Sequence, residues 1–283
     1  MDQRKRNEKI AYGLLWTCGL LALAILIVIL AYIFVGGIPV ITWQFLTGWP
    51  AGWGHTGGGI YPTIIATIQI TALSLLIAAP LSIGGAIYLT EYTKESLFRK
   101  IIRQGAEILA GIPSIILGLF GFLFFVIALK EYTGGWSILS GGLTLAFMIL
   151  PISLRTSEEA LKTVPLELRE GGLGLGATKW QMIRTLVFPT ALPGIITGII
   201  LGMGRAIGET AAILLTVGGA INIATSLQDP ARPMTLHLYD VLTEYRDTTT
   251  AYGTAALLVI AILVITFVTD TLMNRYIRNL KGL

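Results

Sequence analysis

Six long apolar runs constrain this chain more than any other feature of its sequence. Each run approaches or exceeds the roughly 20 residues that an α-helix needs to cross the hydrocarbon core of a bilayer. Only 13% of the 283 residues are charged, whereas soluble domains carry about 25% charged residues. The runs therefore predict an all-α integral membrane protein with six transmembrane helices, which we place at about 10–35, 62–90, 109–130, 136–154, 189–217 and 252–274.

Basic residues between the runs predict the orientation of the chain. Sixteen of the 20 Lys and Arg residues lie in the two terminal tails and in segments 91–108 and 155–188. Cytoplasmic segments carry an excess of Lys and Arg, so both termini of this multi-pass chain are predicted to be cytoplasmic. The first run is too long for the apolar core of a cleaved signal peptide, and it is predicted to remain as a transmembrane helix.

The chain divides into two predicted parts. Residues 1–60 comprise an N-terminal cytoplasmic tail, the first transmembrane helix and an external loop, and residues 61–283 hold the other five helices. His55 lies in the external loop, and we interpret it as an ordinary loop residue rather than a metal ligand. Neither a metal site nor a cofactor is expected.

The cytoplasmic segment 155–189 is expected to form a helix, a glycine turn and a second helix. Thr156 and Glu159 have the spacing of a capping box, in which the two residues satisfy backbone N–H groups at a helix start. Thr178 and Gln181 have the same spacing. Between the two pairs lie four glycines that are expected to break the helix and permit a tight turn, namely Gly171, Gly172, Gly174 and Gly176.

The glycine-rich stretch "GLGLGATK" in this segment does not have the form of a phosphate-binding loop. A Walker A loop follows a strand and contains Gly-Lys followed by Ser or Thr. The dipeptide Gly-Lys does not occur in this sequence. The chain is therefore not expected to be a P-loop ATPase.

The spacing in segment 155–189 resembles the conserved cytoplasmic loop of ABC importer permeases, in which Glu-Ala-Ala precedes a glycine and, further on, a proline. Glu170, Gly176 and Pro189 match the Glu, Gly and Pro of that pattern, and Gly171 and Gly172 replace the two alanines. The resemblance implies the type I ABC importer architecture, with residues 61–283 as its transmembrane domain. It also implies that segment 155–189 is a coupling loop that docks into a groove on a cytoplasmic ATPase.

Four further stretches resemble the phosphate-specific permeases of the PstA type: "GGGIYPTIIATI", "GIPSIILGLFG", "LPISLRTSEEALKTVP" and "RAIGETAA". The resemblance implies phosphate import across a bacterial inner membrane by alternating access, with ATP hydrolysed by a partner rather than by this chain. The implied partners are a second homologous permease of the PstC type, two ATP-binding subunits of the PstB type and an extracytoplasmic phosphate-binding protein of the PstS type. The lipid bilayer surrounds the chain, and no nucleic acid is expected to bind.

Two charges within the fifth apolar run are the main candidates for the transport site. Arg205 and Glu209 are four residues apart and would share one face of a helix. A mid-span arginine costs roughly 2.5–3.5 kcal/mol on insertion scales. The pair could simply neutralise itself, but a guanidinium can also bind two oxygens of an anion at once. Arg155, at the cytoplasmic end of the fourth run, is a weaker candidate because its side chain could instead extend to the interface.

Three other functions remain open. A permease for sulfate, molybdate or phosphonate would keep the coupling loop and differ around Arg205. An autonomous ion-coupled carrier would need internal repeats and more acidic residues within its spans, and it would not explain residues 170–189. A structural membrane scaffold would explain neither the loop nor the intramembrane charges.

Overall fold

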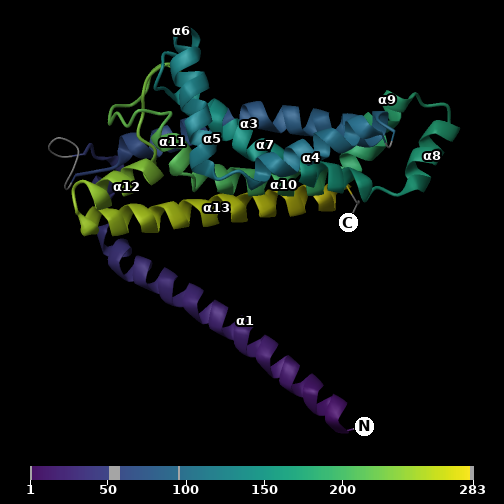
Figure 1. Ribbon diagram of the computed structural model, residues 1–283, viewed down its shortest axis with the longest axis horizontal. Helices are drawn as coiled ribbons and strands as arrows, with labels where there is room; N and C mark the ends of the chain where they lie inside the picture. Colours follow the sequence, from purple (N-terminus) through teal and green to yellow (C-terminus); the bar gives the residue numbers. More distant parts are fainter. Residues whose placement is uncertain (1, 51–57, 95, 281–283) are drawn as a thin grey trace.

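Long helices packed along one axis form the body of the protein. The structure is a computed structural model that describes residues 2–50, 58–94 and 96–280. His55 lies outside the described residues. Four helices run side by side along the long axis (Figure 1): α3 (Tyr61–Ile87), α7 (Ile138–Lys162), α10 (Phe188–Ile207) and α13 (Thr248–Leu280).

Helix α7 lies at the centre of this body, between α3 and α10. Its described side chains are buried or half-buried except for Phe147, Arg155, Glu159 and Lys162. Glycines allow the close packing. A Cβ at Gly142 of α7 would lie 2.6 Å from Leu73 of α3, and a Cβ at Gly198 of α10 would lie 2.7 Å from Thr156 of α7. Without a hydrophobic force between helices in lipid, such small residues permit the close contacts that hold a bundle together.

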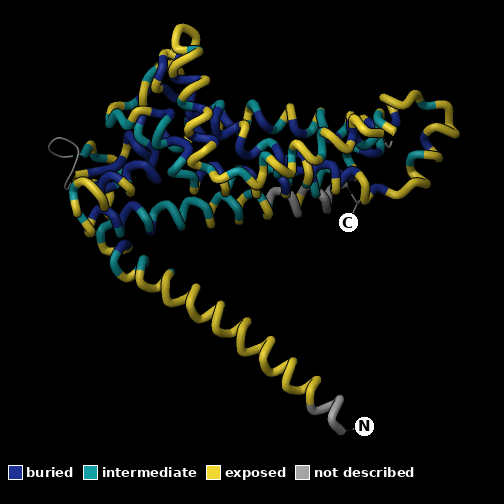
Figure 2. The backbone as a smooth tube through the Cα atoms, in the orientation of Figure 1, coloured by how far each residue is buried: buried dark blue, intermediate teal, exposed yellow. Residues whose placement is uncertain are grey.

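Helix α1 (Asp2–Gly37) lies apart from the rest of the molecule. It joins the bundle at its C-terminal end, where Tyr32 packs edge-on against Tyr252 of α13 with ring centroids 5.5 Å apart. Over most of its length its described side chains are exposed on this chain (Figure 2). A helix that is apolar on all sides suits a lipid or protein surrounding rather than water. The predicted first transmembrane helix is confirmed as a candidate span over Asn7–Val40.

The structure confirms five of the predicted spans as single helices and changes the shape of the third. Five helices are long and apolar enough to cross a membrane, and α4 (Leu97–Gly111) with the helical segment Ser114–Ala128 makes a sixth when this pair, bent by 102°, is counted as one span. The prediction of one run over 109–130 was therefore wrong. Ile112 adopts an extended conformation before Pro113, which stands at the start of helix α5 (Ser114–Gly121). Proline disfavours a helical residue before it, and this explains the bend.

The fifth span also differs from its predicted bounds of 189–217. The helix begins at Lys179 and ends at Ile207. Helix α7 likewise continues to Lys162, so the connection between the two long helices is shorter than the predicted 155–189. Thr156 lies inside α7 and donates its hydroxyl to the Ile152 carbonyl at 2.9 Å, so the capping box expected with Glu159 is wrong. The box of Thr178 and Gln181 is confirmed at the start of α9 (Lys179–Met182).

Both ends of the chain lie toward the same end of the long axis as α8 (Leu166–Gly174), and α12 (Met234–Thr243) lies at the opposite end (Figure 1). This arrangement agrees with an even number of crossings. Which end faces the cytoplasm remains the prediction made from the basic residues.

Cysteine labelling in whole cells tests the orientation. Cys18 is the single cysteine, so Cys18→Ser removes the background. We expect Gln44→Cys, at an exposed position of helix α2 (Trp43–Thr47), to react with an impermeant maleimide from outside. Leu175→Cys, at a position 92% exposed beyond α8, should react only after permeabilisation. The reverse labelling pattern would contradict the orientation.

Candidate functional site

A stripe of exposed residues follows one side of α10. Thr190, Thr197, Leu201, Arg205 and Gly208 are exposed on this chain and recur at helical spacing. Arg205 lies in the last turn of the helix. The C-terminal end of a helix carries partial negative charge, which stabilises a cation there. The stripe therefore presents one fixed positive charge on an otherwise neutral helix face.

Glu209 does not lie on this helix face. Helix α10 ends at Ile207 with Gly208 as its C-cap, so the prediction that Arg205 and Glu209 share one helical face was wrong. The Glu209 carboxylate instead accepts a hydrogen bond from the Ala212 backbone N–H at 3.2 Å. Among the described residues, Arg205 and Glu209 form no ion pair with each other. The self-neutralising pair is therefore absent from this conformation.

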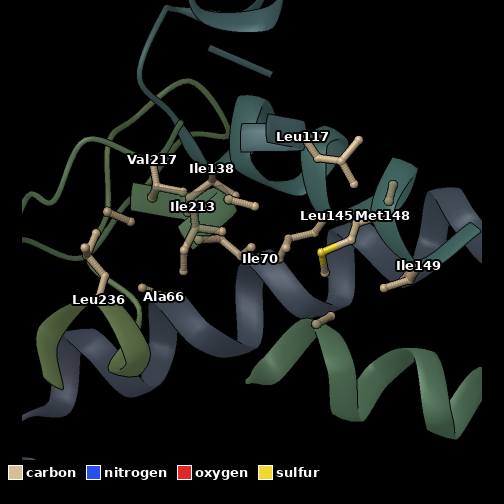
Figure 3. Packing of buried hydrophobic residues seen from close by; sticks show 14 of the residues in the cluster. Ala66, Ile70, Leu117, Ile138, Leu145, Met148, Ile149, Ile213, Val217 and Leu236 are labelled. Atoms are coloured by element: carbon tan, nitrogen blue, oxygen red, sulfur yellow. The ribbon is translucent and has the colours of Figure 1, made fainter. Parts of the chain in front are cut away.

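Tertiary packing explains why the helix stops at Ile207. Ile213 and Val217, which follow the break, are buried in the main hydrophobic core beside Ile138 of α7 (Figure 3). A continued helix would carry the chain away from this core. Gly118 on α5 permits the close approach of the short helix α11 (Ala211–Leu214), because a Cβ there would lie 2.8 Å from the Cα of Ala212.

Contacts from α12 and the loop before it hold the break in place. The Thr235 hydroxyl donates to the Glu209 carbonyl at 2.7 Å. Arg232 Nε donates to the Gly219 carbonyl at 2.8 Å and lies 3.3 Å from Asp240 Oδ2, and both charged side chains are only 11% exposed. Sequence reasoning missed this buried ion pair because nothing local links the two residues.

Arg155 lies at the mouth of a cavity between α4 and α7. Its Nε donates to Glu159 at 3.2 Å and its Nη1 lies 3.7 Å from Glu107 on α4. The side chain is 66% exposed. The cavity has a volume of about 630 Å³, and its charged lining comprises Arg103, Glu107, Arg155, Glu158, Glu159 and Lys162.

Glu158 is the charged residue of this region that sequence reasoning missed. Its side chain is 6% exposed and it accepts hydrogen bonds from the Nε and Nη2 of Arg103, with the Nε contact at 2.8 Å. Lys162 Nζ lies at 3.1 Å and Arg99 Nη2 at 3.5 Å. One buried carboxylate thus joins α4 to the C-terminal end of α7. The spacing of Glu158 and Lys162, four residues apart, is the only local signal of this cluster.

The segment after α7 forms an exposed helical hairpin. The side chains of α8 are exposed or half-buried, apart from the buried Gly172. Leu175 and Trp180 follow with exposures of 92% and 56%. Apolar residues left exposed on a membrane-protein surface mark a contact with another protein or with lipid. Glu170 and Gly171 also lie exposed on α8, whereas Pro189 is half-buried in the first turn of α10.

Of the four glycines predicted to break the helix, only Gly176 makes the turn. Gly171, Gly172 and Gly174 belong to α8 and do not break it. A Cβ at Gly172 would lie 2.7 Å from Leu186, so this glycine permits close packing. Gly176 makes the turn with a φ of +85°, and a Cβ there would meet nothing within 4 Å. The left-handed conformation, and not a lack of space, is therefore the reason for glycine at this position.

Comparison with known proteins identifies the family. The family model described as "Binding-protein-dependent transport system inner membrane component" matches residues 78–282. The "Probable ABC transporter permease protein YqgI" of Bacillus subtilis is 34% identical over 92% of this chain and 93% of that protein. The "Phosphate transport system permease protein PstA 2" of Mycobacterium bovis is 32% identical over 93% of this chain and 87% of that protein.

A solved bacterial alginate ABC transporter, crystallised with a periplasmic protein bound to an alginate pentasaccharide, has a similar fold. Its TM-score is 0.67 at 18% identity, and the match covers 95% of this chain and 96% of that one. The break after α10, the hairpin with α8 and the long packed helices thus occur in a chain whose relatives are transporter membrane subunits. The chain belongs to the family of binding-protein-dependent transport system inner membrane components, the permease subunits of ABC importers.

Proposed function

We propose that this chain is the permease subunit of an ATP-driven phosphate importer, and that the exposed stripe of α10 lines the anion pathway. The observation that carries the proposal is Arg205, a cation at the end of a spanning helix without an ion pair among the described residues. Stripping water from a phosphate anion in a medium of low dielectric is prohibitive unless positive charge is already in place. A guanidinium stays charged and can donate to two phosphate oxygens at once.

The helix break beside Arg205 supports a pathway role. Non-helical backbone at membrane depth is tolerated where it is buried in protein or lines a water-filled cavity. Transporters commonly place their substrate sites at such interrupted helices. Gly208 and Glu209 form the interruption here, and Gly208 is exposed on this chain.

Two observations favour phosphate over sulfate and molybdate. The PstA relative is named for phosphate transport. The carboxylate of half-buried Glu209 accepts one hydrogen bond, from the Ala212 N–H, and keeps further acceptor sites for a ligand. Monohydrogen phosphate carries a hydroxyl that can donate to this carboxylate, whereas sulfate and molybdate at neutral pH cannot donate.

The exposed hairpin supplies the contact with the ATPase in this proposal. Residues 163–178 with Trp180 would dock into a groove of a PstB-type ATP-binding subunit, with Glu170 facing that partner. A PstC-type permease would complete the pathway beside this chain. A PstS-type protein would deliver phosphate from outside, in keeping with the binding-protein dependence that the family is named for.

Competition for uptake tests the substrate. The chain and its partner subunits would be expressed in cells that lack their own phosphate permeases, and uptake of radiolabelled phosphate would be measured. We expect excess unlabelled phosphate to suppress the signal, while equal concentrations of sulfate, molybdate and methylphosphonate leave it nearly unchanged. Faster uptake of labelled sulfate or molybdate than of phosphate would instead assign the chain to another oxyanion.

A further inference from the structure

Arg169 differs from the rest of α8 because its side chain reaches into the bundle. The helix carries exposed residues on either side of it, but the Arg169 side chain is only 16% exposed. It meets Glu91, whose side chain is 6% exposed, in the π-helical turn Tyr88–Tyr92 that ends α3. Nη2 and Nε of Arg169 donate to the same Glu91 oxygen at 3.0 and 3.2 Å.

The same guanidinium also binds the end of α7. Nη2 donates to the Leu161 carbonyl at 2.8 Å, and Nη1 donates to the Val164 carbonyl. The last carbonyls of a helix have no partner within that helix, so these bonds satisfy groups that would otherwise need water. One side chain of α8 therefore holds the ends of both α3 and α7.

The other packing contacts of α8 are with the segment that continues into α10. Gly172 packs against Leu186 and Met182, in the segment that continues into α10. Pro165 is the N-cap of α8, and Gly176 makes a turn just beyond its C-terminal end with a φ of +85°. Among the described residues, Arg169 is the α8 side chain that hydrogen-bonds the ends of α3 and α7.

The ion pair of Arg169 and Glu91 is not expected to add much to the stability of the folded protein. A mostly buried ion pair gains little over apolar residues of the same shape, because removing both charges from water offsets their attraction. What it supplies is a fixed geometry. The planar fork reaches a carboxylate and two carbonyls in different directions, and an ammonium group cannot reproduce those directions from one nitrogen.

We propose that Arg169 is a positioning residue that transmits the displacement of α8 to α3 and α7 when the ATPase moves. The proposal rests on the proposed docking of α8 to an ATP-binding subunit. Loss of the fork leaves α8 joined to α7 only through the short connection 163–165 and packed toward α10. ATP hydrolysis then continues, while the ends of α3 and α7 no longer follow α8 closely. Arg169 acts through Glu91 and the two carbonyls, and it contacts neither phosphate nor ATP.

The test uses the complete importer reconstituted in vesicles, with ATP hydrolysis and phosphate import measured on the same sample. Arg169→Gln leaves buried Glu91 without its cation, so its level in membranes should fall. The fraction that assembles with the ATPase should hydrolyse ATP, but the phosphate imported per ATP should fall about tenfold. Glu91→Gln should lower the same ratio, and the double variant should be no worse than Arg169→Gln. Arg169→Lys should remain impaired. Arg184→Gln, which removes an exposed charge from the same segment, is the matched control and should behave as the wild type.

A second measurement does not depend on the substrate. In a Cys18→Ser background, Thr197→Cys places a thiol on the exposed stripe of α10, and its maleimide labelling rate should change when ATP is added. Arg169→Gln should abolish this change. If the wild type hydrolyses ATP without importing phosphate, the substrate assignment fails, and the labelling result still decides the role of Arg169. An unchanged ratio, a retained labelling response, or loss of ATPase co-purification in Arg169→Gln would overturn the proposal.

Discussion

Replacing Arg205 with glutamine is expected to abolish phosphate uptake while the permease still inserts into the membrane. The guanidinium would make two charge-assisted hydrogen bonds to the anion, and a neutral amide cannot offset the cost of stripping water from phosphate. We expect uptake to fall by about 100-fold or more, on the order of 3 kcal/mol. Because Arg205 is exposed and forms no ion pair with Glu209 in the described structure, membrane levels should stay normal.

Three further variants separate anion binding from charge neutralisation. If Arg205 needed only a counter-charge, the double variant Arg205→Gln with Glu209→Leu would restore uptake. We expect it to be as inactive as the single variant. Arg205→Lys should remain impaired because a point charge lacks the two-oxygen fork, and Glu209→Gln should lose less than Arg205→Gln. The measurement is phosphate uptake in cells without their own permease, with membrane levels checked by blotting. Near-normal uptake by the double variant would show that Arg205 does not bind the anion.

Replacing Glu158 with glutamine should destabilise the folded permease strongly. The buried carboxylate faces the cations of Arg103, Lys162 and Arg99. Removing one partner of a fully buried ion pair typically costs about 3–5 kcal/mol. Arg103 and Lys162 are 31% and 45% exposed, so water screens part of the charge left behind and the cost should lie at or below the lower end of that range. The variant should therefore show a large drop in thermal midpoint in detergent and a low level in membranes. The glutamine amide would also place N–H donors next to the Arg and Lys side chains, which need an acceptor.

The neighbouring residue provides a matched control. Glu159 is 63% exposed and pairs with Arg155 at 3.2 Å, and exposed ion pairs contribute about 0–1 kcal/mol. Glu159→Gln should shift the thermal midpoint little. Equal shifts for the two adjacent variants would show that the cluster around Glu158 does not hold α4 to α7.

Local patterns in the sequence predicted the elements that depend on local physics. Six spans follow from apolar length, because a helix in lipid must satisfy its backbone internally over about 20 residues. The capping box of Thr178 and Gln181 and the helical segment around Glu170 follow from spacing within one or two turns. The relatives confirm the permease family that these motifs indicated.

The errors made from sequence share one cause. Gly208 and Arg205 are helix-end signals that the apolar length of the fifth run concealed, and the burial of Ile213 and Val217 in the core fixes the break at Ile207. Thr156 is a residue type that often caps helices, yet α7 continues past it because α3 and α10 pack against α7. Tertiary packing overrides local helix signals in both places.

The sequence by itself therefore determined where the apolar segments long enough to cross a membrane lie, and that the chain has the motif of the ABC importer permeases. Only the tertiary structure decided which charges meet. Arg103 pairs with Glu158 from 55 residues away, and Arg169 pairs with Glu91 from 78 residues away. Periodicity shows which residues share a helix face, but the pairing of two faces depends on how the helices cross. That crossing is set by the glycine contacts, the bend at Pro113 and the break at Gly208 acting together.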